Sequence, residues 1–116
     1  AFGYWKEQWK SRPLDLNAYQ SEAQKTAIYG INHAVIYPAL GLAGEAGEVA
    51  NKVKKMLRDG DFDRNAVAAE LGDCLWYIAA LSRDLNISMA EIAMSNLEKL
   101  MKRKANGTIK GSGDNR

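Results

Sequence analysis

The chain has 116 residues, of which 47% are hydrophobic, and this size and composition suit one domain with one modest core. Sixteen Lys and Arg against fourteen Asp and Glu leave a formal net charge of +2, too small an excess to indicate binding to long nucleic acid. The single cysteine, Cys74, excludes an intrachain disulfide framework and a cysteine-based zinc site. With no disulfide framework, we expect a reducing, cytoplasmic setting. We expect no membrane role, because the apolar run at residues 74–81 is too short to span a bilayer and the N-terminus lacks the layout of a signal peptide.

The hydrophobic pattern predicts helices and shows no strand-like alternation. Near the N-terminus, Phe2, Trp5 and Trp9 are spaced for one face of a short helix. The first longer helix is predicted over residues 16–29, with Asp15 as its N-terminal cap.

A second helix is predicted over residues 38–59, where apolar residues recur at spacings of three and four and a glycine follows the last turn. Within it, Gly41, Gly44 and Gly47 recur every three residues. A neighbouring helix or a ligand can therefore approach this stripe closely, and we favour helix packing as the reason.

A third helix is predicted after a cap at Asp61 or Asp63, and a fourth over residues 88–105, opened by an S-x-x-E capping box. Apolar positions of the third helix have near-heptad spacing and predict a broad core face: Val67, Leu71, Cys74, Leu75, Ile78, Leu81 and Leu85. Residues 106–116 are predicted to form a flexible tail. The expected architecture is a single all-α domain resembling a four-helix bundle over residues 1–116.

Two pairs of acids lie on neighbouring predicted helices. Glu45 and Glu48 are separated by three positions, as are Glu70 and Asp73, so each pair shares a helical face. Like charges at this spacing weaken a helix, which suggests that a cation compensates them. If the two helices pack antiparallel, the pairs come opposite each other and form an oxygen-only site, which favours Mg²⁺, Mn²⁺ or Ca²⁺.

The acids also have a purely structural interpretation, in which Glu48 pairs with Lys52 on a solvated helix face. Spacing alone does not decide between a metal site and a solvated helix face. The second acidic pair, on the neighbouring helix, favours the metal site. A ferritin-like di-iron site is disfavoured, because it needs Glu-x-x-His motifs and the only histidine, His33, lies in a predicted loop.

The run from Gly41 to Val49 (G-L-A-G-E-A-G-E-V), followed on the next helix by Glu70-Leu71-Gly72-Asp73, resembles the MazG-like nucleotide pyrophosphohydrolases. The resemblance covers roughly residues 16–103. It implies hydrolysis of a nucleoside triphosphate between the α and β phosphates, with Mg²⁺, or Mn²⁺ as a substitute, held by Glu45, Glu48, Glu70 and Asp73. It further implies that Glu45 or Glu48 takes the proton of the attacking water, and that the chain forms a homodimer or homotetramer.

The resemblance also implies substrate contacts outside the four acids. They are Tyr77, one turn after Asp73, the phosphate-binding Asn96, Lys99 and Arg103, and the base-contacting Gln20 and Gln24. An exposed basic helix end and a solvated face of the first helix are the structural alternatives. For Trp5, Trp9 and Tyr29 we favour packing over stacking on a base.

Three other functions remain open. One is a related enzyme that acts on phosphoribosyl-ATP, in which only the base pocket differs. Another is a non-catalytic helical dimerisation module. The last is a helical nucleic-acid-binding domain using the basic runs at residues 52–55 and 99–104, against which the neighbouring acids argue.

Overall fold

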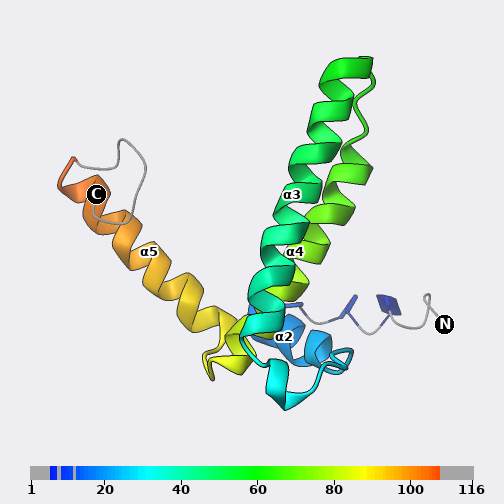
Figure 1. The fold of residues 1–116 in the computed structure, drawn as a ribbon. Coiled ribbons are helices and arrows are strands. Elements are labelled where there is room, and N and C mark those ends of the chain that lie inside the picture. Colours follow the sequence, from blue (N-terminus) through cyan, green and yellow to red (C-terminus); the bar gives the residue numbers. More distant parts are fainter. Residues whose placement is uncertain (1–5, 8, 12, 108–116) are drawn as a thin grey trace.

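The computed structural model describes residues 6–7, 9–11 and 13–107. Within these ranges the fold is all-helical, as predicted, and contains no strand. Its elements are α2 (Leu16–Gln24), the 3₁₀ helix η1 (Ile31–His33), α3 (Ile36–Asp59), α4 (Arg64–Asp84) and α5 (Met89–Ala105). α3 and α4 form a long antiparallel hairpin, α2 lies at its base, and α5 diverges from it (Figure 1). Phe2, Trp5 and residues 108–116 of the predicted tail lie outside the described residues.

Helix α2 begins where the sequence predicts and ends earlier. Asp15 caps it by accepting a hydrogen bond of 2.7 Å from the Ala18 N–H. The predicted end near residue 29 is wrong, because the helix stops at Gln24. Just beyond this end, the Thr26 hydroxyl donates to the Ala23 carbonyl and accepts the indole N–H of Trp76, each at 2.7 Å, which ties the chain to α4.

The predicted ends of the three later helices are close to those observed. Helix α3 starts two residues before Pro38, which occupies the first turn, where its missing N–H costs little. Gly60, at φ 82°, closes α3 in the left-handed conformation. Asp63, rather than Asp61, caps α4, and Ser88 caps α5 by accepting the Glu91 N–H at 3.1 Å.

The core of the described chain is small. Ala79, Ala80 and Met89 are its buried hydrophobic residues, together with Pro38. The predicted core face of the third helix is wrong at three positions: the exposed fractions are 54% at Leu71, 36% at Leu75 and 50% at Leu85. The physical reason is that α2 packs on another side of α4 and α5 turns away (Figure 1).

Side chains from α2 fix the start of α5. The buried Gln20 donates to the Ile87 carbonyl at 3.1 Å and to the Ala79 carbonyl at 3.4 Å. Its amide oxygen accepts the Met89 N–H at 3.0 Å, and Asn17 accepts the Ala90 N–H at 3.0 Å. One buried amide therefore joins α2, α4 and α5.

The start of α3 is held by Asp84, at the end of α4. Val35 has φ 69° and ψ −54°, and the Ile36 N–H donates to the Ala34 carbonyl at 2.8 Å, which makes a γ-turn unusual for a β-branched residue. Asp84 accepts the Val35 N–H at 2.9 Å and the Tyr29 hydroxyl at 2.8 Å. Burial raises the pKa of Asp84, but these donors and the adjacent Arg83 outweigh it and lower the pKa below its usual value.

Across the part of the chain that the structure describes, no helix combines the length and the hydropathy that crossing a bilayer requires.

Candidate active site

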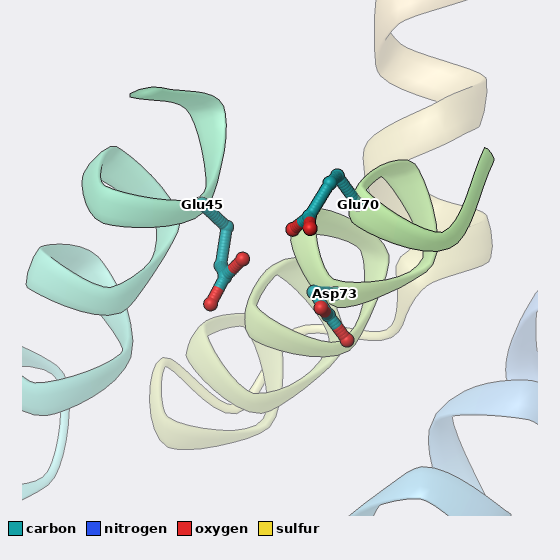
Figure 2. Close-up of side chains that lie close together, drawn as sticks. All are labelled: Glu45, Glu70 and Asp73. Atoms are coloured by element: carbon teal, nitrogen blue, oxygen red, sulfur yellow. The ribbon is translucent and has the colours of Figure 1, made fainter. Parts of the chain in front are cut away.

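Three of the four predicted acids come together between α3 and α4. Figure 2 shows Glu45 on α3 approaching Glu70 and Asp73 on α4, and one carboxylate oxygen of each lies within 4.8 Å of the others. Glu45 and Glu70 are half-buried, whereas Asp73 is exposed, so the cluster is open to solvent. Opposite ligands of Mg²⁺ are about 4.2 Å apart at a metal–oxygen distance of about 2.1 Å, so small side-chain rotations bring these three oxygens into its range. The donor set fits a hard divalent cation.

A close contact between α3 and α4 sets the spacing of the two helices beside the acid cluster. Tyr77 lies one turn after Asp73, and its ring packs directly on the α3 backbone at Gly41, one turn before Glu45. A Cβ atom at Gly41 would lie 2.6 Å from Cδ1 of Tyr77 and overlap other ring atoms. The predicted packing role of the glycine stripe therefore holds at Gly41, whereas a Cβ at Gly44 or Gly47 would meet nothing within 4 Å.

The electrostatics of the cluster disfavour three ionised acids without a compensating charge. The pKa of Glu45 is raised by desolvation, by a hydrogen bond with the Glu70 carboxyl group, and by the negative charges of Asp73, Glu70 and Glu48. A bound cation would reverse this effect, because it favours the ionised form of each ligand.

Glu48 is placed differently from the other three acids. It is exposed and lies outside the group whose oxygens converge, although its charge is close enough to raise the pKa of Glu45. The structure thus brings together Glu45, Glu70 and Asp73 and leaves Glu48 on the next turn of α3.

Tyrosines border the acids. The pKa of Tyr77 is raised by desolvation, by a hydrogen bond with Tyr37 and by the charges of Tyr37, Glu45 and Asp73. Burial and the charge of Asp73 raise the pKa of Tyr19 on α2. The Tyr37 ring stacks on Tyr29 at a centroid distance of 4.9 Å, so Tyr29 packs within the chain.

The predicted substrate contacts on α5 lie on a diverging helix. Asn96, Lys99 and Arg103 belong to the part of α5 that leads away from the hairpin (Figure 1). Asn96 and Lys99 border a shallow pocket with Glu91 and Ile92, and none of the clustered acids lines it.

The two glutamines of α2 differ in their surroundings. Gln20 is buried, and its amide makes the three backbone hydrogen bonds that join α2 to α4 and α5. Gln24 is exposed at the end of α2. Both border a polar pocket with Arg83 and Asn86, which the acid cluster does not line.

Sequence reasoning missed Tyr19, Tyr37 and the particular role of Gly41. Tyr19 is next to Gln20 and Tyr37 is four residues before Gly41, but the helical spacing alone gives no sign that Tyr19 lies near Asp73 or that Tyr37 lies beside Tyr77. The pairing of Gly41 with Tyr77 depends on the register of two helices, which the sequence pattern does not fix.

The MazG nucleotide pyrophosphohydrolase domain matches residues 37–108, well over half of the chain. The chain belongs to the MazG nucleotide pyrophosphohydrolase family. It is also 45% identical, over 114 aligned residues, to the "Gene 37 protein" of Mycobacterium phage L5, and the alignment covers 89% of this chain and 100% of the phage protein. No solved structure matches it significantly.

The MazG region contains all four acids, Tyr77 and the whole of α5. Membership implies a hydrolase of the nucleotide pyrophosphohydrolase type, and MazG enzymes typically depend on a divalent metal. The three-carboxylate cluster is chemically suited to such an ion.

Proposed function

We propose that this MazG protein hydrolyses nucleoside triphosphates, in the presence of Mg²⁺ or Mn²⁺, to nucleoside monophosphate and pyrophosphate. The observation that carries the proposal is the convergence of Glu45, Glu70 and Asp73, with one oxygen of each within 4.8 Å of the others. Oxygen-only sites of this kind suit Mg²⁺ shared with substrate phosphates. Family membership supports the reaction class.

The acids have distinct roles in this proposal. Glu45, Glu70 and Asp73 would hold the cation, whose positive charge neutralises phosphate oxygens and makes a nearby water more acidic. Glu48 lies outside the converging group and is exposed, so its carboxylate is available to accept the proton of the attacking water. Glu45 is the weaker candidate for this role, because its carboxylate converges with Glu70 and Asp73 on the proposed cation position.

Substrate contacts complete the proposal. Tyr77 would border the phosphates from the α4 side, and Asn96, Lys99 and Arg103 would bind phosphate oxygens, the lysine as a point charge and the arginine as a bidentate donor. Because α5 diverges from the α3–α4 hairpin, which carries the acids, these residues fit a homodimer or homotetramer better than an isolated chain. Gln24 is the proposed base contact on α2, since the amide of Gln20 serves the fold.

The test is a substrate panel of ribo- and deoxyribonucleoside triphosphates and phosphoribosyl-ATP, each with Mg²⁺, with pyrophosphate and orthophosphate measured separately. We expect pyrophosphate and the corresponding monophosphate in equal amounts. The control variant Glu98→Gln removes an exposed acid of α5 and should retain parental activity, whereas Glu45→Gln should lose it. Orthophosphate as the first product, or no hydrolysis of any substrate, would reject the proposal.

A further inference from the structure

A pair of tyrosines follows the acid cluster along the interface between α3 and α4. Tyr37 and Glu45 are eight residues apart on α3 and share a helical face, with Gly41 midway between them. On α4, Tyr77 follows Asp73 by four residues and shares its face. The two tyrosine rings are in contact, with a centroid distance of 6.3 Å and an interplanar angle of 48°. They therefore lie one to two helical turns from the acids, or about 6–12 Å along the helix axes.

The acids need support from neighbouring contacts. Glu45, Glu70 and Asp73 bring one oxygen each within 4.8 Å of the others, and ionised carboxylates at such distances repel one another. One turn away, the Tyr77 ring packs on the α3 backbone at Gly41. The position of this ring sets how far apart the acid-bearing turns lie, so a residue that holds the ring also holds the acids in register.

Tyr37 is fixed by contacts with other side chains rather than by burial, because it is 47% exposed. Its ring stacks on that of Tyr29, in the segment between α2 and η1, at a centroid distance of 4.9 Å and an interplanar angle of 24°. Arg83 holds Tyr29 in turn. Its guanidinium group donates to the Tyr29 hydroxyl at 2.8 Å and lies 5.4 Å from the ring centroid. Tyr37 thus lies between an anchored ring and Tyr77.

One buried carboxylate ties Tyr29 to the start of α3. The Asp84 side chain is 6% exposed, and its Oδ2 atom accepts both the Tyr29 hydroxyl at 2.8 Å and the Val35 N–H at 2.9 Å. Val35 lies two residues before Tyr37 and has φ 69°, a conformation that persists only where the surroundings enforce it. The same carboxylate oxygen therefore places the backbone that leads into Tyr37 and the ring that stacks on it.

We propose that Tyr37 is a positioning residue for the acid cluster, whose ring keeps Tyr77 seated on the α3 backbone and so keeps Glu45 within reach of the acids of α4. Tyr37 acts through Tyr77 and needs no contact with the cation or the substrate. Its effect on turnover rests on the proposed function, whereas its effect on cation binding does not require hydrolysis.

A titration with Mn²⁺ in the absence of nucleotide tests the proposal, with the unbound ion measured by electron paramagnetic resonance. Tyr37→Leu removes both ring contacts and should raise the Mn²⁺ dissociation constant at least about threefold. Tyr37→Phe keeps the ring and should stay within about twofold of the parental value. Asp73→Asn shows the loss caused by removing a ligand. The control Asp63→Ala destabilises α4 by removing its N-terminal cap, away from the tyrosines, and should leave the dissociation constant unchanged.

A double-mutant cycle tests whether the effect passes through Tyr37. Tyr29→Leu removes the stacked ring from outside the hairpin, so it should weaken Mn²⁺ binding in the parental background and add little in the Tyr37→Leu background. If circular dichroism shows that Tyr37→Leu has lost its helices, Tyr29→Leu alone carries the measurement. Under the proposed function, Tyr37→Leu should also raise the Mg²⁺ concentration for half-maximal pyrophosphate release by the same factor, which Asp63→Ala should not do.

The outcomes separate this proposal from the catalytic one. A parental protein that releases no pyrophosphate rejects the catalytic function, and a weakened Mn²⁺ affinity in Tyr37→Leu still supports the positioning role. A folded Tyr37→Leu variant with parental affinity, an equal loss in Asp63→Ala, or fully additive losses from Tyr29→Leu and Tyr37→Leu would overturn that role. So would a parental protein that binds no Mn²⁺.

Discussion

The contact between Gly41 and Tyr77 leads to a prediction with a definite sign. Replacing a helical glycine by alanine normally stabilises a helix by about 0.5–1 kcal/mol. At Gly41 the new methyl group would overlap the Tyr77 ring, and overpacking of this kind costs about 1–3 kcal/mol. We therefore expect Gly41→Ala to destabilise the protein, by up to about 2.5 kcal/mol net.

The matched control is Gly44→Ala, three residues further along the same helix, where the methyl group would meet nothing within 4 Å. This variant should gain about 0.5–1 kcal/mol. The two alanine variants then differ by about 1–3 kcal/mol, or about 4–12 °C in thermal midpoint at equal protein concentration for a domain of this size.

Calorimetry or circular dichroism melting measures this difference, and a double-mutant cycle assigns its cause. In a Tyr77→Ala background the ring is absent, so Gly41→Ala should become neutral or stabilising. Equal midpoints for Gly41→Ala and Gly44→Ala in the parental background would refute the claim that this contact sets the spacing of α3 and α4. Because Gly41 lies one turn before Glu45, Gly41→Ala should also raise the Mg²⁺ concentration needed for half-maximal activity.

Three further predictions concern charge. Glu48→Gln and Asp73→Asn should each lower turnover by at least about 100-fold with the helical content unchanged, measured by steady-state pyrophosphate release and circular dichroism. Mg²⁺ at about 100 times its dissociation constant should stabilise the parental protein by about 2.7 kcal/mol in a melting series, and the gain should be much smaller in Asp73→Asn. Asp84 has a folded-state pKa below its unfolded value of about 3.9, so its stabilising contribution is present above that pH and is lost as pH falls through the folded pKa. Asp84→Asn should therefore cost about 1–3 kcal/mol at pH 7 and flatten the acid limb of the stability–pH curve, whereas an unchanged acid limb would show that Asp84 contributes little.

The sequence predicts helices best where one residue decides the outcome locally. Asp15, Asp63 and Ser88 each accept a backbone N–H at the predicted helix start, and Gly60 ends α3 in the conformation that glycine favours. The end of α2 was predicted too late, because it depends on the contact between Thr26 and Trp76, fifty residues apart. No local pattern carries that information.

For the site, spacing predicts which acids share a helix face but not how far each reaches across the hairpin. Glu45, Glu70 and Asp73 converge, whereas Glu48 stays on the exposed next turn, a distinction set by the register of α3 against α4. Gln20 illustrates the same limit. Its position on α2 is equally consistent with a base contact and with a buried amide, and the structure places it among the backbone groups that start α5.

In the proposed homo-oligomer, the predicted phosphate contacts on α5 could belong to the active site of their own chain or to that of a partner chain. Asn96, Lys99 and Arg103 lie on a helix that leaves its own hairpin, so a paired molecule can bring them toward the acids of its partner (Figure 1). We therefore expect complementation between two inactive variants, Asp73→Asn and Arg103→Ala. In a mixed dimer one site would combine unmodified acids from one copy with an unmodified α5 from the other. Statistical mixing makes half of the dimers mixed, each with one intact site, so activity should recover to about a quarter of the parental value. If acids and α5 serve a site within one chain, every site carries a lesion and the mixture stays as inactive as its components.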